Sequence, residues 1–215
     1  MRKLLLASLF FMAAPNLFAQ VKTAFFGGPQ ISTAKYRVNS IKQATGNKYG
    51  FQLGAAVKVP FENNLYFVPS VFYSLKGYEV TLNQMSVPPD SLAIDNDTRI
   101  HTLELAALVQ YDFNKTPNHF FVKFGPSIDV QLFGKEKFNR SNHTVIEQDM
   151  VFSFTKYGRF AANLLVHFGY ETKSGLLVFA HYGHGIGDMN NADFGPAIWH
   201  RVYGVSFGKY FGRKK

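Results

Sequence analysis

Cysteine is absent from this chain of 215 residues, which excludes a disulfide framework and any thiolate chemistry. Tryptophan occurs once, whereas phenylalanine occurs 23 times and tyrosine 11 times. After the first twenty residues, no apolar stretch approaches the roughly 18 residues that a membrane helix needs. Proline and glycine interrupt the chain throughout, and no long helical period is evident. These absences indicate an all-β chain whose aromatic side chains need a large apolar environment.

Acidic residues are also scarce, with 14 Asp and Glu against 23 Lys and Arg and a formal net charge of +9. The chain opens with Arg2 and Lys3, continues with an apolar run over residues 4–14, and reaches a plausible cleavage site at 17–19. We therefore predict a signal peptide over residues 1–19 and a mature chain over 20–215, with a charge of 9 − 2 = +7. Export argues against nucleic acid as the partner of these basic residues.

Eight segments alternate apolar and polar residues with a period of two, which is the period of a β-strand. In the clearest of them, LELAALVQYDF at 103–113, every second residue from Leu103 to Phe113 is apolar. The predicted strands cover residues 22–34, 49–61, 65–78, 99–113, 119–133, 151–170, 175–186 and 198–211.

The connections between these strands alternate between long and short without exception, and the short ones lie at 62–64, 114–118 and 171–174. Transmembrane barrels built of antiparallel hairpins have short periplasmic turns and longer extracellular loops. The sequence therefore predicts an eight-stranded antiparallel transmembrane up-and-down β-barrel in the outer membrane. Both termini then lie on the periplasmic side.

The direction of the apolar rows separates two kinds of barrel. In a soluble exported carrier of the lipocalin kind the apolar rows point inward, whereas in a membrane barrel they face lipid. Here the apolar rows run for up to seven positions, as from Phe120 to Leu132, and the opposite rows are rich in Gly, Ala and Ser. Aromatic residues gather at the row ends, as interfacial girdles require. These features favour the membrane barrel, and the soluble lipid or ligand carrier is the alternative.

Six short motifs carry a resemblance to a known family: GPQIST at 28–33, VPSVFYSLKG at 68–77, TLELAALVQY at 102–111, FGPSIDV at 124–130, HYGHGI at 181–186 and RVYGVSFGKYF at 201–211. With these motifs the sequence resembles the PorT-like small outer-membrane β-barrel proteins of Bacteroidota. The resemblance implies an eight-stranded barrel in the outer membrane, often with no assigned activity. It also implies an association with the type IX protein secretion system.

In each strand, the polar residues that alternate with the apolar row are expected to fill the lumen. An eight-stranded interior is just wide enough for its own side chains, so a structural salt-bridge and hydrogen-bond network is expected, with a proton or solute path as the alternative. Glu104 is expected to pair with Lys123 or Arg159, because their strands are neighbours. The predicted network contains Gln52, Lys58, Lys76, Glu104, Gln110, Asp112, Lys123, Asp129, Gln131, Arg159, Asn163 and His167.

The sequence predicts no catalytic, cofactor or metal site. His181 and His184 are three residues apart, which in a strand places them on opposite faces and makes them a poor chelating pair. Ser153, His167 and Glu171 could form the triad of a lipid hydrolase. Ser153 and His167, however, lie roughly 45 Å apart if both belong to the strand predicted over 151–170. A lipid-modifying enzyme of the outer membrane is therefore only an alternative.

Two long connections carry opposite charge, with an acidic one over residues 79–98 and a basic one over residues 35–48. The basic loop is expected to pair with the acidic loop or with phosphates of lipopolysaccharide. We predict a non-enzymatic outer-membrane barrel with a structural or partner-docking role, and an accessory role in type IX secretion by resemblance only. Its expected partners are outer-membrane lipid, lipopolysaccharide and a secretion or surface protein.

Overall fold

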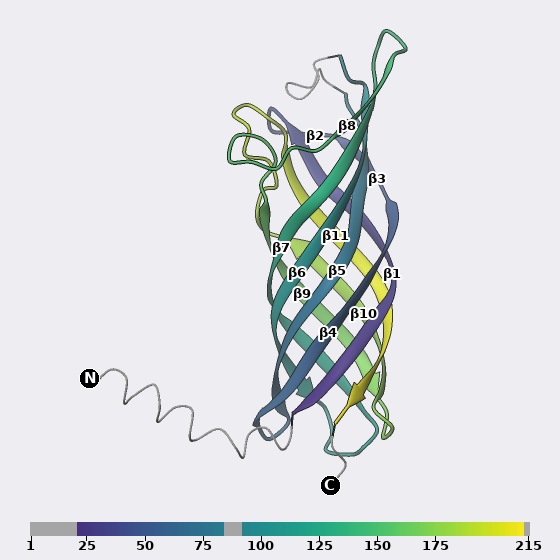
Figure 1. Ribbon diagram of the computed structural model, residues 1–215, viewed down its shortest axis with the longest axis vertical. Coiled ribbons are helices and arrows are strands. Elements are labelled where there is room, and N and C mark those ends of the chain that lie inside the picture. The colour runs from purple at the N-terminus through teal and green to yellow at the C-terminus, as the bar shows by residue number, and fades with distance from the viewer. Residues whose placement is uncertain (1–20, 84–91, 213–215) are drawn as a thin grey trace, which may run out of the picture.

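Eight long strands form a closed antiparallel ring in the computed structural model, which describes residues 21–83 and 92–212. Neighbours pair in the order β11-β10-β9-β7-β6-β5-β4-β1, and β11 pairs with β1 to close the ring (Figure 1). The predicted signal peptide lies outside the described residues. The strands of the ring are β1 (Lys22–Val38), β4 (Lys48–Glu62), β5 (Leu65–Thr81), β6 (Asp95–Asp112), β7 (His119–Asn139), β9 (Phe160–Glu171), β10 (Leu176–Gly185) and β11 (Ala197–Phe211).

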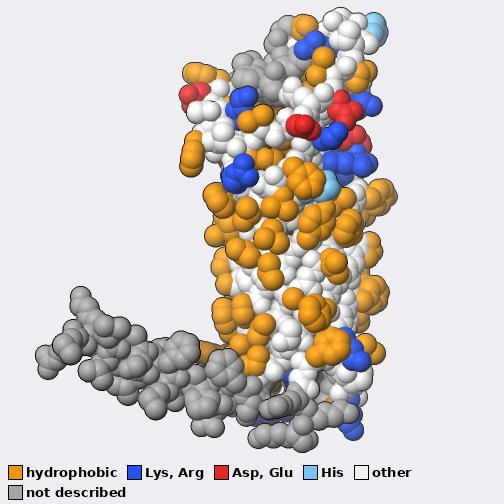
Figure 2. Space-filling model, viewed as in Figure 1, with side chains coloured by type: hydrophobic (Ala, Val, Ile, Leu, Met, Phe, Trp, Pro, Cys, Tyr) orange, Lys and Arg blue, Asp and Glu red, His pale blue; other side chains and the backbone are white. Residues whose placement is uncertain are grey.

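The apolar rows point away from the ring axis. Leu105, Phe124 and Phe207 are 49%, 59% and 60% exposed, whereas Glu104, next to Leu105 in the chain, is 2% exposed. Figure 2 shows the resulting band of hydrophobic side chains, with charged side chains gathered above it. This is the arrangement predicted for a barrel in lipid and the reverse of that in a soluble carrier. Among the described residues, no helix has the length and apolarity to cross a membrane.

The short turns and the described chain ends lie at one end of the ring (Figure 1). Thr23 near the start of β1 pairs with Phe211 at the end of β11, so the first and last strands meet there. The long connections gather at the opposite end, where they form the short strands β2 (Ile41–Lys42), β3 (Ala44–Gly46) and β8 (Val145–Asp149). We call these the short-turn end and the loop end.

The sixth ring strand is shorter than predicted, because it begins at Phe160 and not at residue 151. Residues 151–159 form a loop whose backbone groups bond within the loop and to the next loop, as Tyr157 N–H donates to Val151 O and Gly158 N–H to Met189 O. The apolar residues of this segment resemble a strand in sequence. Tyr157 is instead buried at the loop end of the lumen, in a cluster with inward side chains of the strands such as Tyr36 and Tyr78.

Two apolar clusters fill the lumen at different heights. The lower cluster, toward the short-turn end, consists of Ala24, Phe26, Ala56, Val68, Phe72, Ala106, Leu108, Phe121, Leu165, Leu177, Phe179 and Tyr210. The upper cluster, toward the loop end, consists of Ala34, Tyr36, Val38, Tyr78, Val80, Ile100, Met150, Tyr157, Ala161, Met189 and Ile198. Polar side chains occupy the space between the clusters, so the barrel has a filled interior.

Candidate functional site

A buried ion triad lies between the two apolar clusters. Lys76 Nζ of β5 lies 2.7 Å from Oε2 of Glu104 on β6, and 2.8 and 2.9 Å from the two carboxylate oxygens of Asp129 on β7. The three side chains are 1–3% exposed. Glu104 stands directly opposite Asp129 in the β6–β7 register, which brings two carboxylates together on the inner face. Lys76 offsets the repulsion between them, and Ser127 Oγ donates a further hydrogen bond to Glu104.

Amides and histidines surround the triad. Gln30 donates to Ser74 Oγ at 2.8 Å, and Gln52 donates to Ser206 Oγ at 2.9 Å. Beside the triad lies a cavity of about 10 Å³, lined in part by Lys76, Glu104 and His181. Such a volume holds about one water molecule. This cavity therefore has no room for a solute larger than water.

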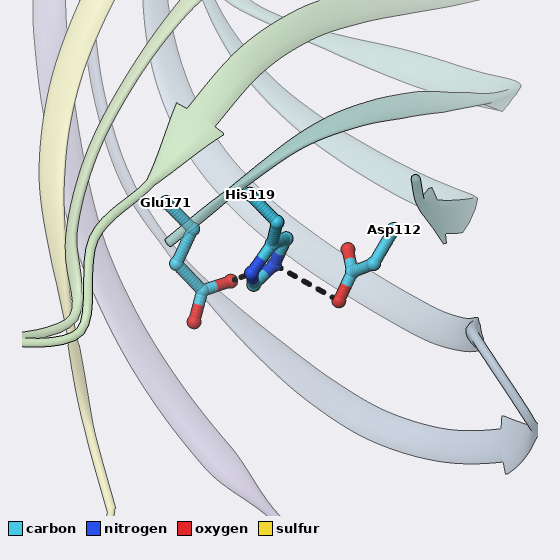
Figure 3. A group of neighbouring side chains, drawn as sticks. All are labelled: Asp112, His119 and Glu171. Carbon is cyan, nitrogen blue, oxygen red and sulfur yellow. Dashed lines mark ion pairs between the residues drawn. The ribbon is translucent and has the colours of Figure 1, made fainter. Parts of the chain in front are cut away.

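A second charged group closes the short-turn end (Figure 3). Asp112 ends β6, His119 begins β7 and Glu171 ends β9, so that three strand ends place these side chains together. His119 Nε2 lies 3.1 Å from Oδ2 of Asp112 and 3.5 Å from Oε2 of Glu171. Lys58 Nζ contacts the same two carboxylates at 2.7 and 2.8 Å. Lys22 adds a contact to Glu171 at 3.2 Å.

This short-turn cluster has the residue types of a metal site. The ligand atoms of Asp112, His119 and Glu171 lie within 4.8 Å of one another, and all three residues are buried. His119 Nδ1 lies 2.9 Å from Thr116 O and donates to it, which turns Nε2 toward the carboxylates. Lys58, however, already contacts both carboxylates and Lys22 contacts Glu171, so a divalent cation would have to displace the ammonium group of Lys58. The geometry therefore fits a network of ion pairs that connects three strand ends.

Glu136 forms a third buried acidic position, on the extension of β7 beyond the apolar band. Its outward neighbours Lys135 and Lys137 are charged, which places this level outside lipid. Burial raises the pKa of Glu136 to about 7, although Tyr157 Oη donates a hydrogen bond of 3.1 Å to its Oε2. Burial also raises the pKa of Tyr157 well above its ordinary value. The upper apolar cluster thus surrounds a carboxyl group that favours its neutral form.

The structure places eleven of the twelve predicted lumen residues inside the ring: Gln52, Lys58, Lys76, Glu104, Gln110, Asp112, Lys123, Asp129, Gln131, Asn163 and His167. Arg159 is the exception. It precedes β9, is exposed, and donates to the carbonyl oxygens of Gln131 and Phe152. Its position follows from the loop at 151–159, which the sequence analysis had assigned to a strand.

The prediction that Glu104 pairs with Lys123 or Arg159 was also wrong. The partner is Lys76, because Lys123 lies six residues beyond Asp129, the residue that stands opposite Glu104 on β7. At about 3.3 Å per residue, Lys123 and Asp129 are therefore about 20 Å apart along β7. Lys123 instead donates to Tyr210 Oη at 3.3 Å, at the height of the lower apolar cluster.

The histidines and the candidate triad are placed as follows. His181 faces the lumen and His184 faces outward, on opposite faces as predicted. Ser153 lies in the loop before β9, His167 is buried in the lumen and Glu171 lies at the short-turn end. The argument that Ser153 and His167 share one strand was wrong, but the structure does not bring the triad together. The group of Asp112, His119 and Glu171 was missed, since Glu171 is distant in sequence from Asp112 and His119, which flank one short turn.

Comparison with known proteins gives one family match. Residues 18–191 match the model of the family described as outer membrane protein beta-barrel domain. No curated protein matches the sequence.

Solved structures similar to this chain include three bacterial proteins. Ail, the attachment invasion locus protein of Yersinia pestis, is 12% identical, with 88% of this chain and 98% of that chain covered and a TM-score of 0.45. The outer membrane protein OprG of Pseudomonas aeruginosa is 13% identical, with 89% and 96% covered and a TM-score of 0.47. Neisserial surface protein A is 13% identical, with 87% and 99% covered and a TM-score of 0.43.

Proposed function

Because the chain belongs to the outer membrane protein beta-barrel domain family, we propose that it is a sealed, non-enzymatic barrel whose loop end docks a protein partner. The observation that carries the proposal is the filled lumen, with the buried ion triad between two apolar clusters. A barrel without an aqueous path through its lumen does not conduct solutes. Its function then depends on the surfaces at its two ends.

The orientation that we propose places both chain ends and the short turns in the periplasm and the loop end outside the cell. Two features support it. Short turns are typical of the periplasmic end of outer-membrane barrels, and long loops of the extracellular end. The strands β5, β6 and β7 continue beyond the apolar band only at the loop end, where their outward residues include the charged Arg99 and Lys135.

The loop end has features of a docking surface. The loop before β9 and the loop before β11 bond to each other, since Asn191 N–H donates to Lys156 O at 2.7 Å and Gly158 N–H to Met189 O at 2.7 Å. From this joined pair, Phe154 and Phe194 project with 94% and 88% of their surface exposed. Exposed aromatic residues on a braced support are typical anchors of protein interfaces.

The partner that we propose is a protein of a secretion machine, of the type IX system, with an accessory role for this barrel. The support for this identity is the resemblance to the PorT-like family. A lipid-modifying activity is less well supported, because Ser153 and His167 are not brought together in the part of the chain that the structure describes.

Two experiments test the proposal. In planar bilayers the purified barrel should give no stable conductance, and reproducible single-channel steps would overturn the sealed-barrel role. A photocrosslinker at position 154 should capture subunits of the secretion machinery in native outer membranes. The same crosslinker at Lys173 in a short turn is the matched control, and equal capture of the same subunits at both positions would contradict docking at the loop end.

A further inference from the structure

Four cations share one outward surface of the loop end, which we call the basic face. Lys35 and Arg37 lie on β1, Lys42 on β2 and Arg201 on β11. Arg37 stands directly opposite Lys42, and Lys35 stands directly opposite Trp199, which is two residues from Arg201 and on the same face. Because residues directly opposite in antiparallel strands share a face, the four side chains form one patch.

The positive charge of the basic face is not compensated within the described chain. None of the four cations forms an ion pair with a described residue, and like charges directly opposite each other destabilise a sheet. Arg37 Nε is buried and has no hydrogen-bond partner. Asp188 of the neighbouring loop instead accepts backbone hydrogen bonds from Asn190 and Ile198.

The part of the barrel formed by β4 to β7 is different at a similar height. There Lys48 Nζ lies 3.3 Å from Glu79 and 2.6 Å from Asp97, and Lys135 lies 3.3 Å from Glu147. Figure 2 shows acidic and basic side chains mixed on this side, above the hydrophobic band. On that side carboxylates lie among the cations, although Arg99 of β6 stands opposite Lys135 without an ion pair, whereas the described residues of the basic face include four cations and no carboxylate partner.

Two of the four cations of the basic face, Arg201 and Lys35, are held in place by their neighbours. Arg201 Nη1 donates to Gly185 O at 3.1 Å and to His200 O at 2.9 Å, which fixes the guanidinium plane. Lys35 Nζ lies 5.0 Å from the ring centroid of Trp199. Guanidinium groups fixed in this way are suited to bind phosphate, because their forked donors match its oxygens.

The height of the basic face identifies the kind of ligand. Directly toward the barrel middle, Tyr203 and Ile31 are 50% and 38% exposed and belong to the apolar band. Trp199, the only tryptophan of the sequence, lies at the boundary, where tryptophan is enriched at membrane interfaces. Arg201 lies between Tyr203 and Trp199 along β11, and Lys35 lies level with Trp199, so both cations lie at the depth of lipid headgroups.

We propose that the basic face binds the phosphate groups of a lipid in the outer leaflet of the outer membrane. The bound phosphate lies between Lys35 and Arg201, with Arg37 and Lys42 on the loop side. This inference rests on the proposed orientation, since only then does the basic face meet the outer leaflet. It assigns a lipid site to one side of the barrel, separate from the protein-docking loops.

The test uses the mature chain refolded in micelles of a neutral phosphocholine detergent. Lipid A with both phosphates is titrated in, and the emission of Trp199 and the thermal unfolding midpoint report binding. We expect saturable binding to the native chain. The double variant K35Q/R201Q should need a higher lipid fraction for half saturation, by about fivefold for each cation removed. The matched variant R99Q/K135Q, which removes two cations from the other side, should stay within about twofold of the native chain.

Three further measurements test whether the basic face recognises the phosphate groups of the lipid. Lipid A without phosphates should bind weakly, and binding equal to that of the phosphorylated lipid would overturn phosphate recognition. Inorganic phosphate alone should give no response up to millimolar concentration, and a full response would reassign the site to a free anion. An equal loss in K35Q/R201Q and R99Q/K135Q would show general attraction and would overturn a specific face. Migration of the unheated protein on gels confirms that each variant is folded.

The proposed orientation of the barrel is tested in a separate labelling experiment. Since the chain has no cysteine, a single cysteine at position 154 can be labelled in intact cells with a membrane-impermeant reagent. No labelling would overturn the proposed orientation, whatever the lipid assay shows. Labelling together with no lipid response would overturn the lipid site alone.

Discussion

Replacing Lys76 by methionine should be among the most destabilising single changes in the barrel. The substitution keeps most of the side-chain volume but leaves Glu104 and Asp129 facing each other with 2% and 1% exposure and no cation. Removing one member of a buried ion network costs about 3–5 kcal/mol, because an uncompensated charge stays in a low-dielectric interior. The exposed cation Lys135, which pairs with Glu147, provides the contrast, since such surface pairs contribute about 0–1 kcal/mol.

The measurement is urea unfolding of the chain refolded in lipid vesicles, followed by Trp199 fluorescence and by gel migration of unheated samples. The free energy of unfolding is extrapolated to zero urea for native, K76M and K135M chains. A triple variant, K76M/E104Q/D129N, removes all three charges and should recover most of the lost stability, because the cost arises from unpaired charge and not from lost volume. A loss below about 1 kcal/mol for K76M, or no recovery in the triple variant, would refute this account of the triad.

Three further predictions concern the wall, the lipid face and the loop end. Gly54→Ala should destabilise by about 1–3 kcal/mol, because a Cβ there would lie 2.2 Å from Cβ of Phe72, whereas Gly183→Ala should cost less since its nearest contact is a side-chain atom at 3.3 Å. Equal effects of the two changes on urea unfolding would contradict this reasoning. Leu105→Arg should cost roughly 2–4 kcal/mol in vesicles if position 105 lies near the membrane midplane, and an unchanged unfolding free energy would contradict lipid contact. The folded state raises the pKa of Glu136 from 4.5 to about 7, so the native chain should lose stability as pH rises through this window, by up to about 1.4 kcal/mol per unit. Glu136→Gln should remove this component of the pH dependence, and parallel curves for the two chains would exclude the effect.

The ring itself could be predicted from the sequence, because its information is local. A period of two assigns each residue to a face, and a slip by one residue would move the whole apolar row to the wrong face. The apolar row from Phe120 to Leu132 and the polar row beside it therefore define a wall that needs no knowledge of distant residues. The same is true of the short turns, which fix the neighbours of most strands.

The contacts inside the lumen could not be predicted in the same way, because they depend on the stagger between strands. The pair of Glu104 and Lys76 requires the β5–β6 register, in which Glu104 lies opposite Phe72 and Lys76 opposite Ile100. The first nine residues of the strand predicted over 151–170 failed for a different reason. Phe152 and Phe154 alternate with polar residues as in a wall strand, but Tyr157 is buried in the upper apolar cluster, and only the tertiary structure distinguishes the two environments.

The unequal lengths of the ring strands raise one part of the molecule above the rest. β7 runs for 21 residues and β10 for 10, and the last seven residues of β7, at 133–139, continue beyond the apolar band paired with β6 or β8. At about 3.3 Å per residue, reduced by the strand tilt, this hairpin stands on the order of 15–20 Å above the lipid surface. In the proposed orientation this extension of β7, paired with β6 and β8, holds its tip above the lipid surface, beyond the sugars next to the membrane. Antibodies and bacteriophage would therefore meet this tip before any other part of the described chain.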